Sequence, residues 1–323
     1  MKRWFFKEST SCNLVLLKEK SYQQMHPCRI LRYMESNVFE TALIFEGGGM
    51  RASYSSAAVN LLLQSEIFFD KVYGVSAGAS CTVNYTSRDQ WRAKESFVGF
   101  VTDPKFGGWG TFLAHKGYFS AHYIYQETGL PGGTLEFDFD TWQSNPADIC
   151  ISSFERDTGK TVYWTKADMP CLEDLMVRVR ASSSLPLFMP PPEIDGKRYY
   201  DGGIGEGAGL LLDKAIADGY ERFFVVRTRP RGYRKDLGKK GVAPLFHQRP
   251  HLYRALKSRS ARYNEVCDRL DELERQGRAY VVYANDITAT SATTNLEKLE
   301  ENYRMGMDQY LRELDSWRAF LKI

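Results

Sequence analysis

Short apolar runs that end at glycine or serine, each followed by helical spacing, mark the first part of the chain. Residues 41–46 (TALIFE) form such a run and end at three glycines, and residues 52–65 then place apolar side chains at helical spacing. Residues 71–78 (KVYGVSAG) repeat the order of strand, tight turn and helix. Two such units in succession predict a parallel sheet with helices on its faces, which is an α/β fold.

The middle of the chain continues this pattern of strands and helices. Apolar runs predict further strands at 148–154, 160–165 and 222–229. Residues 172–184 predict a helix, which ends at the run LPLFMPPP because proline fixes φ and has no backbone donor. Residues 193–203 predict a hairpin that turns at Asp195 and Gly196 and ends with YYDGG.

The C-terminal part of the chain has a different composition. Between Arg227 and Arg262 basic residues dominate, and Asp236 is the only acidic one. Two long helical patterns follow, with a strand predicted between them, over 251–277, 294–319 and 279–284. We expect an N-terminal extension, a main α/β domain and a mostly helical C-terminal extension packed on the same body, over residues 1–40, 41–230 and 231–323.

Composition and charge change this picture only a little. The 323 residues are 43% hydrophobic, as in an ordinary globular protein, and the net charge of +3 is too small to argue for nucleic acid, so we expect no such partner. None of the six cysteines is spaced as CxxC and the five histidines form no ligand cluster, so we expect free thiols, no metal and no cofactor. No apolar run suits a signal peptide or a membrane span, so we expect a cytoplasmic protein with at most transient peripheral contact with membranes.

The sharpest candidate for chemistry is GVSAG, Gly74 to Gly78, at the end of a predicted strand and the start of a predicted helix. This is the context in which G-x-S-x-G forms a nucleophile elbow. The turn holds its serine in a strained backbone conformation, so the neighbouring side chains must be small, as Gly74, Ala77 and Gly78 are. The pattern therefore predicts that the Ser76 hydroxyl projects above the sheet as a nucleophile.

A serine nucleophile needs a base, and histidine is the usual one. His247 and His251 follow Ser76 in the sequence, but both lie in the basic run FHQRPH, with no strand end to place them. His115 and His122 lie in an aromatic loop region and have no better claim.

A carboxylate is the alternative base. Asp201 follows a predicted strand, and the two glycines after it, Gly202 and Gly203, let the backbone turn sharply and let another backbone approach. Taken alone, the tripeptide is also an ordinary Asp-Gly turn, so the residues by themselves leave the identity of the base open.

Four motifs together resemble the patatin-like phospholipase family, and more closely its bacterial members with a C-terminal extension. They are EGGGMR, GVSAG, the serine- and proline-rich SSSLPLFMPPP, and DGG, and they fall in this order within residues 41–230. Each motif is weak alone, and all four in order are specific. The resemblance implies a three-layer α/β/α sandwich with a largely parallel central sheet. It also implies a lipid acyl hydrolase of the phospholipase A or lysophospholipase type.

The resemblance further implies roles for individual residues. Ser76 would be the nucleophile and Asp201 the general base of a dyad that works through an acyl-enzyme. The amides that would bind the oxyanion are those of Gly47, Gly48, Gly49, Met50 and Arg51. Ala52 departs from the family, whose Gly-rich motif ends in glycine. A positive φ there would cost about 1 kcal/mol or more, and we expect position 52 to be helical instead.

Other functions remain open from the sequence. EGGGMRAS could cradle a phosphate at a helix N-terminus, but it lacks the lysine of a P-loop and leaves Ser76 and Asp201 unexplained. A non-catalytic lipid- or phosphate-binding protein of the same fold is the main alternative. The basic residues between 227 and 262 could meet anionic headgroups, or could form a solvated positive face. The headgroup, the acyl chain and the oligomeric state stay open.

Overall fold

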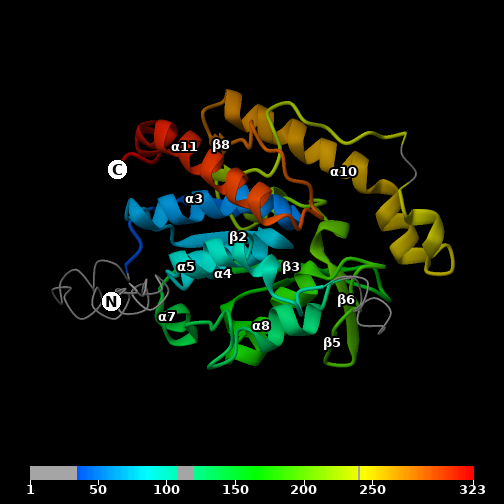
Figure 1. The fold of residues 1–323 in the computed structure, drawn as a ribbon. Coiled ribbons are helices and arrows are strands. Elements are labelled where there is room, and N and C mark those ends of the chain that lie inside the picture. Colours follow the sequence, from blue (N-terminus) through cyan, green and yellow to red (C-terminus); the bar gives the residue numbers. More distant parts are fainter. Residues whose placement is uncertain (1–34, 108–118, 239–240) are drawn as a thin grey trace, which may run out of the picture. The chain divides into compact units, whose positions relative to one another are not determined.

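One sheet of eight strands runs through the part of the chain that the computed structural model describes, residues 35–107, 119–238 and 241–323 (Figure 1). The order is β5-β6-β3-β2-β1-β7-β8, and β4 also pairs with β3. The pairs from β3 to β8 along this order are parallel, whereas β4, β5 and β6 pair antiparallel. The strands are β1 (Thr41–Phe45), β2 (Lys71–Val75), β3 (Asp148–Glu155), β4 (Thr161–Trp164), β5 (Glu193–Ile194), β6 (Lys197–Asp201), β7 (Arg222–Val226) and β8 (Ala279–Val282).

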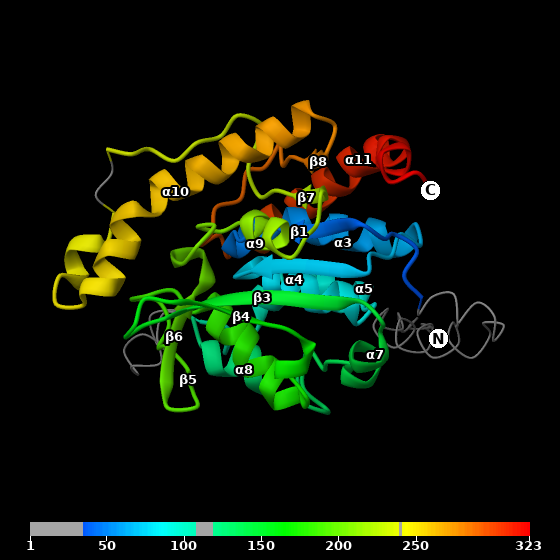
Figure 2. The same ribbon diagram turned by 180° about the vertical axis from the view of Figure 1, so that it is seen from behind.

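Helices cover both faces of this sheet. Figure 1 shows α3, α4, α8 and α11 on one face, and Figure 2, seen from behind, shows α9 and α10 on the other. The described helices are α3 (Ala52–Gln64), α4 (Ala77–Thr86), α5 (Gln90–Glu95), α7 (Phe139–Ser144), α8 (Leu172–Ser183), α9 (Leu212–Ala217), α10 (Pro250–Arg275) and α11 (Leu296–Leu321). Short 3-10 turns that matter for the site span Gly49–Arg51 and Gly202–Ile204.

Alternating side chains of the central strands explain why both faces are covered. In β7, Phe223 and Val225 belong to the core beneath α9 and α10. The residue between them, Phe224, points the other way and meets Trp317 of α11 with ring centroids 5.2 Å apart. A strand that is buried on both faces needs apolar residues throughout, which is why TALIF and RFFVV show no polar alternation.

The fold expected from the sequence is confirmed as a three-layer α/β/α arrangement with a mostly parallel central sheet and a helical C-terminal region. The hairpin turn also forms as expected, because Asp195 and Gly196 both have positive φ, 51° and 72°. The strand expected at 279–284 is β8, which pairs in parallel with β7, so the C-terminal region also extends the main sheet. Of the expected N-terminal extension, only residues 35–40 lie within the described residues.

The register of the sheet brings the two halves of the site together. Val75 at the end of β2 pairs with Ser152 of β3, and Ser153 of β3 pairs with Asp201 at the end of β6. Ser76 therefore lies level with Asp201, one strand apart. The glycines after β1 lie at the same edge, since β1 and β2 are parallel neighbours.

Candidate active site

The turn between β2 and α4 has the geometry of a nucleophile elbow. Ser76 has φ 58° and ψ −129°, a conformation that residues with a Cβ rarely adopt. A Cβ on Gly74 would lie 2.3 Å from the carbonyl oxygen of Gly78, and a Cβ on Gly78 would lie 2.3 Å from that of Phe45. Both glycines of the motif are therefore required by close backbone approach. The Ser76 amide donates to Oγ of Ser182 in α8 at 2.9 Å, which fixes the turn from the other side.

Ser76 and Asp201 are in direct contact. Ser76 Oγ donates to Asp201 Oδ2 at 2.6 Å, and Asp201 Oδ1 accepts from the Gly203 amide at 2.7 Å. Asp201 is only 2% exposed. Burial raises the pKa of its carboxyl above the ordinary value, although the Arg259 charge and the hydrogen bonds from Ser76 and Gly203 act in the opposite direction. A carboxylate with a raised pKa is a better proton acceptor than one in water.

The loop that carries Asp201 is held by the sheet on one side and by α10 on the other. A Cβ on Gly202 would lie 2.2 Å from the carbonyl oxygen of Ser152 in β3, so only glycine fits there. From α10, Arg259 Nε donates to the Gly203 carbonyl at 2.6 Å, and Arg262 Nη2 donates to the Ile204 carbonyl at 2.7 Å. The C-terminal region thus positions the Asp201 turn directly.

The Gly-rich loop after β1 faces the same space, and some of its amides already have partners. The Gly47 amide donates to the Gly209 carbonyl at 3.0 Å, and the Met50 amide donates to the Ser291 carbonyl at 3.2 Å. The Arg51 amide closes the 3-10 turn on Gly48 at 3.4 Å. Among the described residues, no acceptor is paired with the amides of Gly48 and Gly49.

Ala52 stands where the Gly-rich motif of the family has glycine, and its backbone conformation decides whether alanine fits there. Ala52 has φ −67° and is the first residue of α3, so no left-handed backbone is needed there. The positive φ of the loop falls on Gly49 instead, at 57°, where an added Cβ would also lie 2.5 Å from the Ser291 carbonyl. Alanine at position 52 therefore leaves the loop unstrained.

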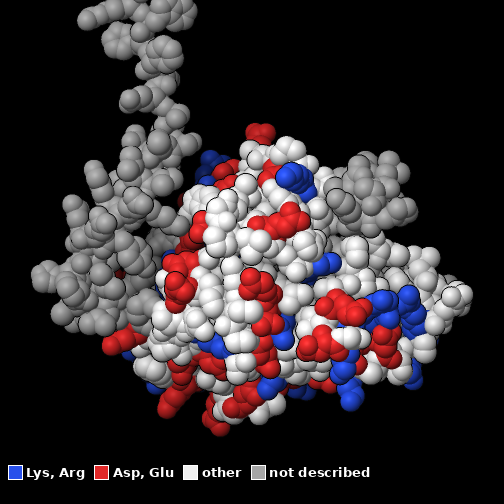
Figure 3. All heavy atoms as spheres, turned by 90° about the horizontal axis from the view of Figure 1, so that it is seen from below, with Lys and Arg blue, Asp and Glu red and all other residues white. Residues whose placement is uncertain are grey.

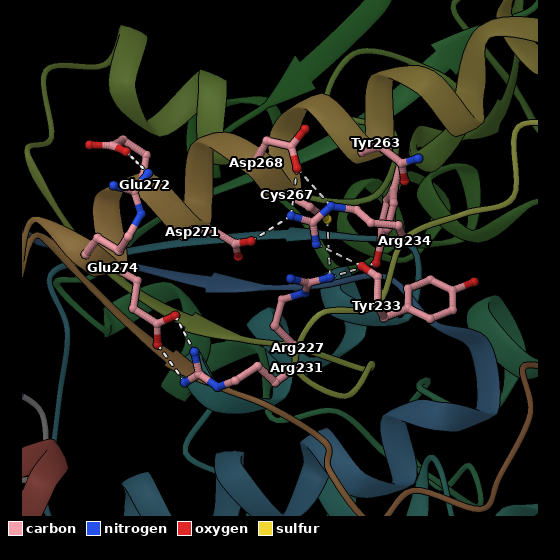
Figure 4. A network of polar contacts seen from close by, with 12 residues as sticks. Arg227, Arg231, Tyr233, Arg234, Tyr263, Cys267, Asp268, Asp271, Glu272 and Glu274 are labelled. Carbon is pink, nitrogen blue, oxygen red and sulfur yellow. Dashed lines mark hydrogen bonds and ion pairs between the residues drawn. The ribbon is translucent and has the colours of Figure 1, made fainter.

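A buried ion pair beneath the loop was not anticipated from the sequence. Glu46 Oε2 accepts from Arg227 Nε at 2.9 Å and from the Thr228 amide at 2.7 Å, and Glu46 Oε1 accepts from the Tyr263 hydroxyl at 2.5 Å. Figure 4 shows Arg227 and Tyr263, with Tyr263 coming from α10. Thr228 in turn donates its hydroxyl to the Gly47 carbonyl at 3.0 Å. The sequence signal for this ion pair was Glu46 itself, an acidic residue between an apolar strand and the glycines.

These elements surround one cavity of about 170 Å³. Ser76 and Asp201 line it together with the three glycines of the loop. The cationic side chains on its wall are Arg51, Arg229, Lys235 and Arg259. Two of these, Arg229 and Lys235, come from the segment that follows β7, and Arg259 comes from α10.

The described histidines lie elsewhere. His251 lines a larger surface cavity of about 500 Å³ that contains neither Ser76 nor Asp201. His247 bonds to the Pro244 carbonyl, and His122 bonds to Glu127 on the surface. His115 lies outside the described residues. Within the described residues, the group paired with Ser76 is Asp201, and a histidine triad has no geometric support there.

Two observations concern the molecular surface. None of the helices in the described part of the chain is both long and apolar enough to cross a membrane. On the face that Figure 3 shows, acidic and basic side chains are interspersed. The peripheral membrane contact expected from the sequence stays a prediction.

Comparisons with known proteins bear on the family to which the chain belongs. A family model described as patatin-like phospholipase matches residues 43–212, and a model described as a domain of unknown function (DUF6363) matches residues 249–322. The crystal structure of VipD from Legionella pneumophila is similar at 13% identity and a TM-score of 0.47, over 85% of this chain and 67% of that one. The comparison with curated proteins gave no match.

The fold and the site define an α/β protein of three layers with a serine elbow facing an aspartate. The family model covers more than half of the chain, so the protein belongs to the patatin-like phospholipase family. This confirms the resemblance drawn from the four motifs. Membership supports a hydrolase type of function directed at lipids.

Proposed function

We propose that this protein is a serine acyl hydrolase that cleaves lipid or related acyl esters through a Ser76–Asp201 dyad. The observation that carries the proposal is the 2.6 Å hydrogen bond from Ser76 Oγ to Asp201 Oδ2. It joins a serine on a strained elbow to a buried carboxylate, at the wall of a cavity bordered by two backbone amides that have no acceptor among the described residues. Family membership supports the same chemistry.

In the first half of the reaction, Ser76 Oγ attacks the ester carbonyl carbon and its proton passes to Asp201 Oδ2. The carbonyl oxygen becomes an oxyanion while the new C–O bond forms. When the tetrahedral intermediate collapses, the ester C–O bond breaks, and the proton on Asp201 passes to the departing alcohol. The product at this stage is an acyl-enzyme on Ser76.

In the second half, water replaces the alcohol. Asp201 accepts a proton from the water as its oxygen attacks the acyl carbon, and the same amides hold the second oxyanion. The bond to Ser76 Oγ then breaks, and Asp201 returns the proton to that oxygen. The fatty acid leaves, and both residues regain their starting protonation states.

The proposed oxyanion hole is narrower than the loop of five amides that the family resemblance implied. Gly48 and Gly49 have amides without a protein acceptor among the described residues, whereas Gly47, Met50 and Arg51 donate within the protein. We therefore assign the oxyanion donors to Gly48 and Gly49. One such donor typically contributes about 3–4 kcal/mol of transition-state stabilisation. The internal bonds of the other three amides keep the loop in place before substrate binds.

Hydrolysis of a panel of neutral esters of varied chain length tests the dyad. Ser76→Ala and Asp201→Asn should each lower kcat/KM by about 1000-fold or more, because each removes a group that acts at the reacting atoms. Asp195→Asn is a matched control, since Asp195 is exposed in the β5–β6 turn and Asn-Gly suits that turn equally well. Activity retained in Asp201→Asn, or lost in His247→Asn or His251→Asn, would defeat the dyad.

The alternative of a non-catalytic lipid- or phosphate-binding protein gives a different result in the same experiment. Wild-type protein would then hydrolyse none of the esters, although circular dichroism would show it folded. Ester hydrolysis that disappears in Ser76→Ala contradicts this alternative.

A further inference from the structure

We infer that Arg51, Arg229, Lys235 and Arg259 form an anion subsite beside Ser76, which selects acyl esters whose alcohol carries a terminal phosphate. The inference rests on the proposed function and names the substrate class for that same cavity. Only Arg51 follows from the Gly-rich motif. The other three side chains come from beyond residue 212, where the patatin-like model ends.

The pairing of these four cations differs from that of other basic residues nearby. None of the four forms an ion pair with any described residue, although other arginines of the same segments do. Arg259 uses Nε on the Gly203 carbonyl, and Lys235 Nζ lies 3.5 Å from the Ala208 carbonyl. Arg229 lies over the Tyr233 ring at 4.1 Å. These contacts hold three of the side chains in place without a direct ion pair to a carboxylate.

Two arginines between Arg229 and Lys235 are paired with carboxylates, in contrast to the cations of the cavity wall. Figure 4 shows that Arg231 and Arg234, which lie between Arg229 and Lys235 in sequence, reach acidic residues of α10. Arg231 pairs with Glu274 at 2.7 Å, and Arg234 pairs with Asp268 at 2.7 Å. The segment after β7 thus places its paired arginines against α10 and its unpaired cations on the cavity wall.

The carboxylates near the cavity do not neutralise these charges. Glu46 has both oxygens occupied by Arg227, Thr228 and Tyr263. Asp201 bonds to Ser76 and to the Gly203 amide. Three arginines and Lys235 therefore share the cavity wall with Asp201 and with Glu46, which is already paired with Arg227.

The groups around Lys235 show how strongly the cations act on one another. Burial first, and then the charges of Arg259, Arg229 and Arg51, lower the pKa of Lys235 to about 7 against the opposing effect of Glu46. The Tyr263 ring lies 3.9 Å from Lys235 Nζ on the α10 side. An anion bound between these side chains would relieve their mutual repulsion.

A terminal phosphate fits this environment better than other headgroups. It carries up to two negative charges and offers three acceptor oxygens, which guanidinium groups bind in bidentate pairs. A phosphocholine or phosphoethanolamine headgroup would bring another cation to a wall that is already positively charged. The cavity of about 170 Å³ has room for a phosphate group next to the ester.

The arrangement also gives the C-terminal region a part in specificity. Arg259 lies within residues 249–322, which match the domain of unknown function. The Ser291 carbonyl, from the same region, holds the Met50 amide of the Gly-rich loop. Residues 249–322 would therefore complete the site of the patatin-like domain.

The test compares three soluble substrates below their critical micelle concentrations, so that attraction to a charged lipid surface plays no part. These are dihexanoyl phosphatidic acid, dihexanoyl phosphatidylcholine and dihexanoylglycerol. The measured quantity is the ratio of kcat/KM for the phosphatidic acid to that for the uncharged glyceride. We expect wild type to prefer the phosphatidic acid by about 10-fold or more, the size of one or more charge-assisted hydrogen bonds.

The variants Arg229→Gln and Lys235→Gln should each lower this ratio by about 3- to 10-fold. The matched control Arg231→Gln removes a charge from the same segment but outside the cavity, and should leave the ratio unchanged. A purely structural role of Arg229 or Lys235 would lower both rates together and leave the ratio unchanged, which would overturn the inference.

Two further outcomes separate this inference from the proposed function. Wild type that hydrolyses all three substrates without preference keeps the proposed function and overturns the subsite. Calorimetric titration of Ser76→Ala with inorganic phosphate, at constant ionic strength, distinguishes a site for free anions. Phosphate binding that depends on Arg229 and Lys235, without preference for the phosphatidic acid, also overturns the assignment to substrate.

Discussion

The strained backbone of Ser76 can be tested separately from its chemistry. Ser76→Ala and Ser76→Gly both remove the hydroxyl and its bond to Asp201, so both should be inactive. They differ in the Cβ, which alanine keeps at φ 58° and ψ −129° and glycine lacks. The comparison between these two variants therefore isolates the free energy of the strained turn.

The magnitude follows from two opposing contributions. A residue with a Cβ in a sparsely populated backbone region costs about 1–3 kcal/mol, which glycine would recover. Glycine loses about 0.4–1 kcal/mol because its unfolded chain has more freedom. We expect Ser76→Gly to be more stable than Ser76→Ala by about 1 kcal/mol, which raises the unfolding midpoint by roughly 2 °C in a domain of this size.

Differential scanning calorimetry measures this difference, and an exposed helical position supplies the control. At Lys257 in α10, glycine should be less stable than alanine by about 1 kcal/mol, because glycine is a poor helix former. The sign should therefore reverse between the two sites. A Ser76→Gly variant that is no more stable than Ser76→Ala would refute the claim that the elbow is strained.

Three other predictions concern charge and protonation. Because burial raises the pKa of Asp201, kcat/KM for neutral esters should fall as the pH falls through that raised pKa, and a pH–rate profile in which Asp201 titrates at its ordinary value would contradict this. Glu46→Gln should lower the free energy of unfolding by about 3–5 kcal/mol in a urea titration, since it leaves Arg227 charged and unpaired in a buried site. The exposed pair at Arg231 offers the comparison, because Arg231→Gln should cost about 1 kcal/mol or less. Lys235 has a depressed pKa of about 7, so its charge is present below that pH and is lost above it. Because the phosphate gains its second charge in a similar range, wild type is compared with Lys235→Gln at each pH: the ratio of their preferences for phosphatidic acid should fall as the pH rises through this value.

The sequence predicted the layers of this fold because the strands are buried on both faces. TALIF and RFFVV are apolar except at their first positions, Thr41 and Arg222, and TALIF leads to the glycine-rich loop. The elbow could also be predicted from the sequence. Glycine is required at positions 74 and 78, because a Cβ there would collide with the backbone of Gly78 and of Phe45 in β1. Steric requirements between residues close in the sequence produce a short motif, which can be recognised without the structure.

The cavity wall could not be predicted in the same way. Arg229, Lys235 and Arg259 lie in a basic run that also contains Arg231 and Arg234, which are paired on the surface of α10. Nothing in the order of residues separates the two groups, because the distinction depends on where α10 packs. The pairing of Glu46 with Arg227 spans 181 positions and depends on β1 lying beside β7.

The oxyanion donors within the Gly-rich loop could not be predicted from the sequence either. The sequence marks the whole loop from Gly47 to Arg51 by its glycines. Which amides are free depends on the carbonyls of Gly209 and Ser291, which lie far along the chain. Long-range backbone hydrogen bonds leave no local pattern, so only the structure separates Gly48 and Gly49 from the rest.

Labelling with a fluorophosphonate, followed by peptide mapping, tests the central claim most directly. The reagent phosphonylates a serine only where a base and an oxyanion hole activate it. We predict a single adduct on the peptide that contains Ser76, strongly reduced in Asp201→Asn, absent in Ser76→Ala and unchanged in Asp195→Asn. An adduct on another serine, or folded wild-type protein that takes up no label, would contradict the account.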